Sequence, residues 1–160
     1  MCADPRSPVW RRRVAERRLA DDAEVWVASA SADGTPHLVP LSFDWNGTDL
    51  LLATVADSPT GRNLAATGLV RLWLGPTRDV TMIEGSVEVL EIDRLPAERA
   101  GRFAARTGFD PRSLTALYRW FRVTPSRIQA WREEDELPGR DLMRAGRWLA
   151  RSKATVGPIG

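Results

Sequence analysis

The chain has 160 residues, of which 43% are apolar, and its 23 basic residues face 21 acidic ones for a formal net charge of +2. This length suits a single domain spanning 1–160, and the near-balance of charge argues against nucleic acid as a partner. The chain has one cysteine and one histidine, which argues against disulfides and against a metal site. It shows no long apolar run and no signal-peptide pattern, so we expect a cytoplasmic protein without membrane contact.

The first part of the chain predicts one helix and three strands. The helix covers 8–20 and is expected to direct Trp10, Val14 and Leu19 toward the core. The strands cover 24–30, 37–45 and 50–55 and are joined through the turn signals Asp33-Gly34 and Asn46-Gly47. Within the second strand, alternation places Val39, Leu41, Phe43 and Trp45 on one face.

The middle of the chain predicts a short helix and two further strands. The helix covers 58–67, and Gly68 can supply the left-handed residue that ends it. The strands cover 69–74 and 80–90. In the second of them the apolar positions shift phase between Met82 and Val87, which indicates a β-bulge at or next to Gly85.

The last part of the chain predicts helices over 95–107 and 112–117 and a sixth strand over 118–131 that is interrupted at Pro125. A small hairpin around Ala145-Gly146 follows the acidic run 133–136. Six hairpin-linked strands with few helices favour a mainly β fold, a closed six-stranded antiparallel barrel with peripheral helices. The core is expected to span about 24–131, between the N-terminal helix 8–20 and a C-terminal tail 132–160.

The stretch after the third strand carries the strongest chemical signal. Ser58 is a favoured N-cap and Pro59 suits the first helical position, so the N–H groups of Thr60 and Gly61 would point out of the helix end. The partial positive charge at such an end can hold a phosphate, and Arg62 adds a forked donor suited to it. Gly61 would leave room for the ligand to approach. An ordinary capped helix without a ligand is the alternative interpretation.

Several short motifs follow one another at specific spacing: Asp33-Gly34-Thr35-Pro36-His37, Pro40-Leu41-Ser42-Phe43, Thr54, Ser58, Arg62-Asn63-Leu64 and Glu84-Gly85. In order and spacing they resemble the pyridoxamine-phosphate-oxidase-like split barrels, which are flavin and deazaflavin oxidoreductases. The matching motifs cover roughly residues 24–90. The resemblance implies the FMN-binding split barrel, in which six antiparallel strands form the barrel.

The resemblance also implies a homodimer with two cofactors bound in clefts between the subunits. It implies that the phosphate end of the cofactor lies against Ser58, Thr60, Gly61, Arg62 and Asn63. Pro40, Leu41, Ser42 and Thr54 would lie along the ring system, and Arg78 would reach the partner subunit's cofactor. No catalytic side chain is implied, since a flavin-type ring carries the hydride chemistry itself.

The implied activity is hydride transfer between the bound cofactor and a small organic substrate. Many relatives carry a lysine where this chain has Thr60, and the only lysine is Lys153. The cofactor is either FMN or coenzyme F420, and a phosphate end with dispersed arginines favours the anionic tail of the deazaflavin. A protein that binds or sequesters the cofactor without turnover is the alternative. A nucleic-acid-binding barrel is a third possibility, for which the sequence offers no basic-aromatic platform.

Overall fold

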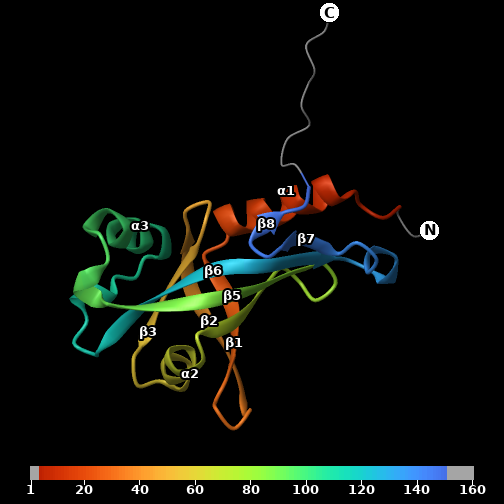
Figure 1. The fold of residues 1–160 in the computed structure, drawn as a ribbon. Helices are drawn as coiled ribbons and strands as arrows, with labels where there is room; N and C mark the ends of the chain where they lie inside the picture. Colours follow the sequence, from red (N-terminus) through yellow and green to blue (C-terminus); the bar gives the residue numbers. More distant parts are fainter. Residues whose placement is uncertain (1–3, 151–160) are drawn as a thin grey trace, which may run out of the picture.

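The computed structural model describes residues 4–150, so Cys2 and Lys153 lie outside the described residues. The helices are α1 (Pro8–Asp21), α2 (Pro59–Thr67) and α3 (Ala97–Thr107), and the 3-10 turns are η1 (Ile92–Arg94), η2 (Pro111–Ser113) and η3 (Glu134–Glu136). The strands are β1 (Glu24–Ala30), β2 (Pro36–Trp45), β3 (Leu50–Val55), β4 (Leu69–Leu74), β5 (Val80–Glu91), β6 (Tyr118–Trp131), β7 (Asp141–Arg144) and β8 (Arg147–Trp148). Figure 1 shows α1 along one end of the sheet, α3 at its side and α2 near the opposite end.

The strands form one antiparallel sheet that closes on itself. The order is β3-β2-β1-β4-β5-β6, and β3 also pairs with β6 from Leu50↔Val123 to Val55↔Tyr118. This closure confirms the predicted six-stranded antiparallel barrel. β7 and β8 extend the sheet beyond β6 as the predicted small hairpin, whose turn residues Ala145 and Gly146 have φ of 48° and 73°, as a type I′ turn requires.

Two apolar clusters hold the barrel and its covering helix together. Leu50 and Leu52 of β3 belong to the interior cluster, whereas Leu51 and Ala53 belong to an outer cluster that includes Phe103 of α3. Because successive side chains of a strand point to opposite faces, β3 is buried on both sides. The shared face predicted for Val39, Leu41, Phe43 and Trp45 of β2 is confirmed, and it points inward, since all four side chains lie in or against the interior cluster.

The buried face of α1 agrees with the prediction at Leu19 but differs from it at Trp10. Arg11, Ala15 and Leu19 are buried, whereas Trp10 is 46% exposed. The Arg11 guanidinium donates to the carbonyl oxygens of Ala130 and Glu136 at 3.2 and 3.3 Å. An arginine can be buried where backbone oxygens satisfy its donors, and in this arginine-rich helix that contact fixes the rotation of α1.

The predicted bulge lies at the expected place but on the neighbouring strand. The register of β5 and β6 shifts between Glu84 and Gly85, because Glu84 pairs with Arg127 and Gly85 with Pro125. Ser126 is therefore the extra residue, and β6 runs through Pro125 as one bulged strand rather than being interrupted there. A Cβ on Gly85 would lie 2.6 Å from Val123 Cγ1, so the bulge brings the two strands too close for a side chain.

The helix predicted over 112–117 is wrong. Only η2 forms there, and an irregular segment then leads into β6. Asp110 Oδ1 accepts the N–H of Arg112 at 3.0 Å, and Pro111 O accepts the N–H of Leu114 at 3.5 Å. An aspartate that binds its own backbone two residues on favours a turn over a continuing helix.

Candidate functional site

The barrel is split between β2 and β3. β2 pairs with β1 from Ser42 down to Pro36, but it pairs with β3 only from Phe43 to Trp45. Beyond that point the residues 53–55 of β3 continue to pair with β6 instead. An opening therefore separates 36–42 from 53–55, and α2 begins directly beyond the β3 side of it.

The residues predicted to bind a cofactor gather around this opening, with one exception. Pro40, Leu41 and Ser42 lie on the β2 side, Thr54 lies on the β3 side, and the helical residues follow at the start of α2. The exception is Arg78, which belongs to the turn between β4 and β5. Figure 1 shows that turn well away from α2. Its exposed guanidinium donates to Glu133 at 2.8 Å, a contact that raises the pKa of Arg78. Within one subunit Arg78 does not join the other predicted residues.

A backbone donor of β2 faces the opening. The N–H of Phe43 donates to Ala23 O at 3.0 Å, on the β1 side. Consecutive residues of a strand direct their N–H groups to opposite sides, so the N–H of Ser42 points toward β3, where the ladder has ended. The backbone nitrogen of Pro40, two residues before Ser42, points to the same side. This agrees with the rule that a proline within a strand has its nitrogen at an edge without a partner strand.

Ser58 forms the predicted N-cap of α2, and that role occupies its hydroxyl. Ser58 Oγ accepts the N–H of Gly61 at 3.0 Å and donates to Val55 O at 2.7 Å, while Thr54 Oγ1 lies 3.4 Å away. Helix geometry leaves the N–H of Thr60 without an intrahelical acceptor. The helix end thus offers a backbone donor rather than the serine hydroxyl.

The structure gives a different reason for Gly61 from the one expected. A Cβ at this position would lie 2.4 Å from Val55 O and 2.7 Å from Ala56 O. The glycine therefore allows the first turn of α2 to pack against the end of β3, and the space beside it is filled by the chain's own backbone.

The other three predicted phosphate ligands differ in exposure. Arg62 is exposed, and its Nη1 donates to the carbonyl oxygen of Asp57 at 2.7 Å and lies 3.2 Å from the carboxylate. Such an exposed pair contributes little, so Arg62 is free to turn toward an anion. Thr60 is only 2% exposed, and Asn63 is buried and donates to Ser29 Oγ of β1 at 3.1 Å. Asn63 thus ties α2 to the β1–β2 hairpin.

Arg119 is a cation beside the opening that the sequence reasoning missed. It lies directly across the β3–β6 ladder from Thr54, so the two side chains share one face of the sheet. Its Nε lies 2.9 Å from Glu91 Oε1. The sequence contains a pattern that could have indicated this residue. Arg119 alternates with Phe121 and Val123, whose side chains point into the barrel, so a charged residue stands where that apolar face ends.

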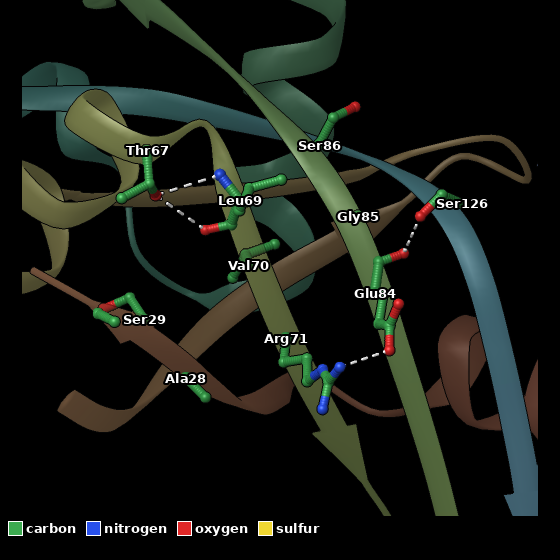
Figure 2. A pocket seen from close by; sticks show the side chains of 11 residues that line it. Ala28, Ser29, Thr67, Leu69, Val70, Arg71, Glu84, Gly85, Ser86 and Ser126 are labelled. Carbon is green, nitrogen blue, oxygen red and sulfur yellow. Dashed lines mark hydrogen bonds and ion pairs between the residues drawn. The ribbon is translucent and has the colours of Figure 1, made fainter. Parts of the chain in front are cut away.

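A separate hollow lies on the other side of the β1–β2 hairpin. The β1–β4 ladder ends at Ala28↔Arg71, although β1 runs on to Ala30 and β4 begins at Leu69. The resulting hollow has a volume of about 500 Å³, and Figure 2 shows its β1 side and its β5 side with β4 between them. None of the residues predicted to bind the cofactor lines it.

A closed antiparallel barrel that opens between two strands beside a short capped helix defines the split-barrel class of proteins. The sequence agrees with the geometry, because residues 14–132 match the family described as pyridoxamine 5'-phosphate oxidase. The chain belongs to this family.

Solved structures share the fold at low sequence identity. An F420 reductase is 19% identical, with a TM-score of 0.59 over 71% of this chain and 94% of that one. General Stress Protein 26 from Bacillus anthracis str. Sterne is 18% identical, with a TM-score of 0.55 over 78% and 95%. A conserved hypothetical protein from Mycobacterium tuberculosis is 16% identical, with a TM-score of 0.59 over 84% and 88%. No curated protein sequence matches the chain.

The structure of residues 4–150 also bears on metal binding and membrane crossing. No group of three or more His, Cys, Asp or Glu side chains in this part of the chain is arranged to hold a metal ion. None of the helices described there is long and apolar enough to cross a membrane.

Proposed function

We propose that the protein is a flavin- or deazaflavin-dependent oxidoreductase that holds its cofactor in the opening between β2 and β3. The proposal is supported by three donors on the elements that border this opening: the N–H of Ser42 on β2, the N–H of Thr60 at the α2 end, and the exposed Arg62 guanidinium. This donor set fits a phosphate at the helix end and an electron-rich ring beside β2. When bound, such a cofactor supplies the hydride chemistry itself.

The chain's own residues would bind and orient the cofactor. Arg62 would leave Asp57 and pair with the phosphate, and the N–H of Thr60 would donate to the same group. The N–H of Ser42 would donate to the ring system, where it can stabilise negative charge. Arg119, across the ladder from Thr54, adds positive charge to the same end of the barrel.

The composition of the phosphate end favours the deazaflavin, coenzyme F420, over FMN. FMN ends in its phosphate, which a compact fixed cation suits, but Thr60 stands where such a lysine would lie and is itself buried. The deazaflavin continues past its phosphate into carboxylates, and exposed arginines such as Arg62 fork onto both groups. Side-by-side fluorescence titrations at physiological salt test this preference. Binding of FMN about tenfold tighter, a difference of about 1.4 kcal/mol, would overturn it.

Arg62→Ala tests the site itself. Loss of one charge-assisted hydrogen bond should weaken cofactor binding by about 1.5–3 kcal/mol. Arg17→Ala, which removes an exposed arginine from α1, is the matched control and should leave the affinity unchanged. Equal affinities of wild type and Arg62→Ala would remove Arg62 from the site. Turnover with an artificial electron acceptor then separates an oxidoreductase from a protein that only carries the cofactor.

We also propose that a second copy of the chain covers an apolar area on the outer face of the sheet. The ladder registers place Pro40, Trp26, Trp73 and Met82 in one row across four strands. Trp26 is 47% exposed, and Leu38 beside this row is more exposed still. A stable dimer would need to bury at least about 1,000 Å² here.

Trp26→Glu should convert the dimer to a monomer, because a carboxylate would be desolvated at the interface. Trp10→Glu is the control, since Trp10 is exposed to the same extent but lies on α1. Light scattering at fixed concentration distinguishes the two. A wild-type protein that is monomeric at micromolar concentration would refute the dimer.

A further inference from the structure

The hollow beside β4 is lined by a backbone edge that has no strand partner. Ala23 O accepts from Phe43 and so faces β2, which means that the even-numbered residues of β1 face β4. Ala28 uses this side to pair with Arg71, but the ladder ends there. The N–H and C=O of Ala30 have the same phase as those of Ala28, so they face the hollow beyond the last pair of the β1–β4 ladder.

On the opposite side of the hollow, the polar groups at the start of β4 form hydrogen bonds within the chain. Thr67 Oγ1 accepts the N–H of Leu69 at 3.2 Å and donates to Asn63 O at 2.9 Å. Figure 2 shows this side chain turned to the start of β4. Unused backbone hydrogen-bonding capacity is thus concentrated on the β1 side, at Ala30.

Arg71 supplies positive charge with donors to spare. Its side chain is 60% exposed, and its Nη2 lies 2.6 Å from Glu84 Oε1, as Figure 2 shows. A guanidinium has five N–H groups, so most remain available. Glu84 also lies 3.9 Å from Arg127, so one carboxylate is shared between two guanidinium groups. An additional anion therefore fits beside Arg71.

We propose that this hollow binds a small organic monocarboxylate with a compact apolar body and a second polar end. The carboxylate would pair with Arg71, and the body would lie against Ala28, Leu69 and Val70, which line the hollow. Ala30 lies two residues beyond Ala28, roughly 7 Å along the strand. A hydroxyl of the ligand at that distance from its carboxylate would accept a hydrogen bond from the N–H of Ala30 and donate one to the C=O of Ala30. A phosphate dianion fits less well, since Glu84 would repel it.

The probe that matches this description is 4-hydroxybenzoate, and the measurement is an amide chemical-shift titration of the full chain. Saturable shifts are expected at Ala30, Arg71 and Ser86. Arg71→Gln should weaken binding about tenfold or more, the loss of a charge-assisted hydrogen bond. Arg144→Gln is the control, because Arg144 is an exposed arginine that does not line the hollow. The neutral analogue 4-hydroxybenzamide should bind about tenfold more weakly to the wild type.

A second variant guards against indirect effects of removing Arg71. Ser86 is exposed and lines the hollow, so Ser86→Trp should fill the space and abolish binding while leaving the Arg71 guanidinium in place. Equal affinity in Arg71→Gln and wild type, tighter binding of inorganic phosphate, or no saturable shift at millimolar probe would each overturn the proposal. Shifts confined to Ser42 and Thr54 would do so too. The proposal does not rest on the cofactor site, which lies on the other side of the hairpin.

Discussion

Glu136 should make the stability of the protein strongly dependent on pH in the acid range. Its side chain is 3% exposed and accepts the backbone N–H of Arg6 at 2.8 Å, two guanidinium N–H groups of the same residue and the backbone N–H of Arg132. The Arg6 hydrogen bond, against an opposing cost of burial, lowers the pKa of Glu136 from 4.5 to about 2. These contacts join the segment before α1 to the loop after β6.

The size and sign of the effect follow from the two pKa values. Each tenfold change in acidity corresponds to about 1.4 kcal/mol, so ionised Glu136 stabilises the folded state by roughly 3 kcal/mol at neutral pH. The lowered pKa means that the folded protein binds this proton less readily than the unfolded chain. The contribution is therefore complete above about pH 4.5 and is lost as the pH falls toward about 2.

Glu136→Gln tests this reasoning in urea denaturation followed by tryptophan fluorescence, at fixed protein concentration. The variant should lose roughly 3 kcal/mol at neutral pH, and its difference from wild type should shrink steadily below about pH 4.5. Glu133→Gln is the control, because Glu133 is exposed and pairs only with the exposed Arg78 in the contacts described. A Glu136→Gln variant as stable as wild type at neutral pH, or a difference that does not change with acid, would refute the argument.

Three further substitutions have definite expected outcomes. Asp44 is 1% exposed and pairs with three arginines of α3, so Asp44→Asn would leave those arginines around a neutral side chain. The variant should lose about 3–5 kcal/mol of stability in urea denaturation and should exchange the amides of α3 faster. Unchanged amide exchange would show that Asp44 does not hold α3 on the barrel. Gly61→Ala forces a Cβ to 2.4 Å from Val55 O, so it should destabilise by about 1–3 kcal/mol in thermal unfolding and weaken cofactor binding. Gly101 lies in the middle of α3 with nothing within 4 Å of an added Cβ, so Gly101→Ala should stabilise the protein by about 0.5–1 kcal/mol. If both alanine variants changed the stability in the same direction, the space around each Cβ would not explain the effects.

The sequence predicted the parts of the fold that local chemistry determines. Asn46-Gly47 and Ala145-Gly146 specify their hairpins through turn geometry, and Ser58 with Gly68 specifies both ends of α2. On α1 the burial of Leu19 was predicted correctly, but the burial of Arg11 in place of Trp10 was not, because the acceptors that bury Arg11 come from the far end of the chain. Such acceptors leave no trace in the helix's own hydrophobic pattern.

The candidate site was predicted only in outline for a similar reason. The N-cap motif located the α2 end, but the commitment of the Ser58 hydroxyl to Val55 depends on how closely the helix packs on β3. The open edges at Ser42 and Ala30 exist because ladders end at particular residues of neighbouring strands. A ladder's end is a property of the closed barrel, and no single segment contains the information that sets it.

The β1–β2 hairpin has a consequence for how specificity can change in this protein. Its strands pair with each other over seven residues, and each strand leaves part of its outer edge unpaired, β2 beyond its three pairs with β3 and β1 beyond its three pairs with β4. What a ligand meets on this wall is peptide N–H and C=O groups, which every sequence retains except where a proline removes a donor. Substitutions in the hairpin would therefore preserve these backbone contacts, and selectivity for one ligand over another would depend chiefly on side chains across each gap, on β3, β4, β5 and α2. A library aimed at new substrates should vary those facing residues and leave the hairpin constant.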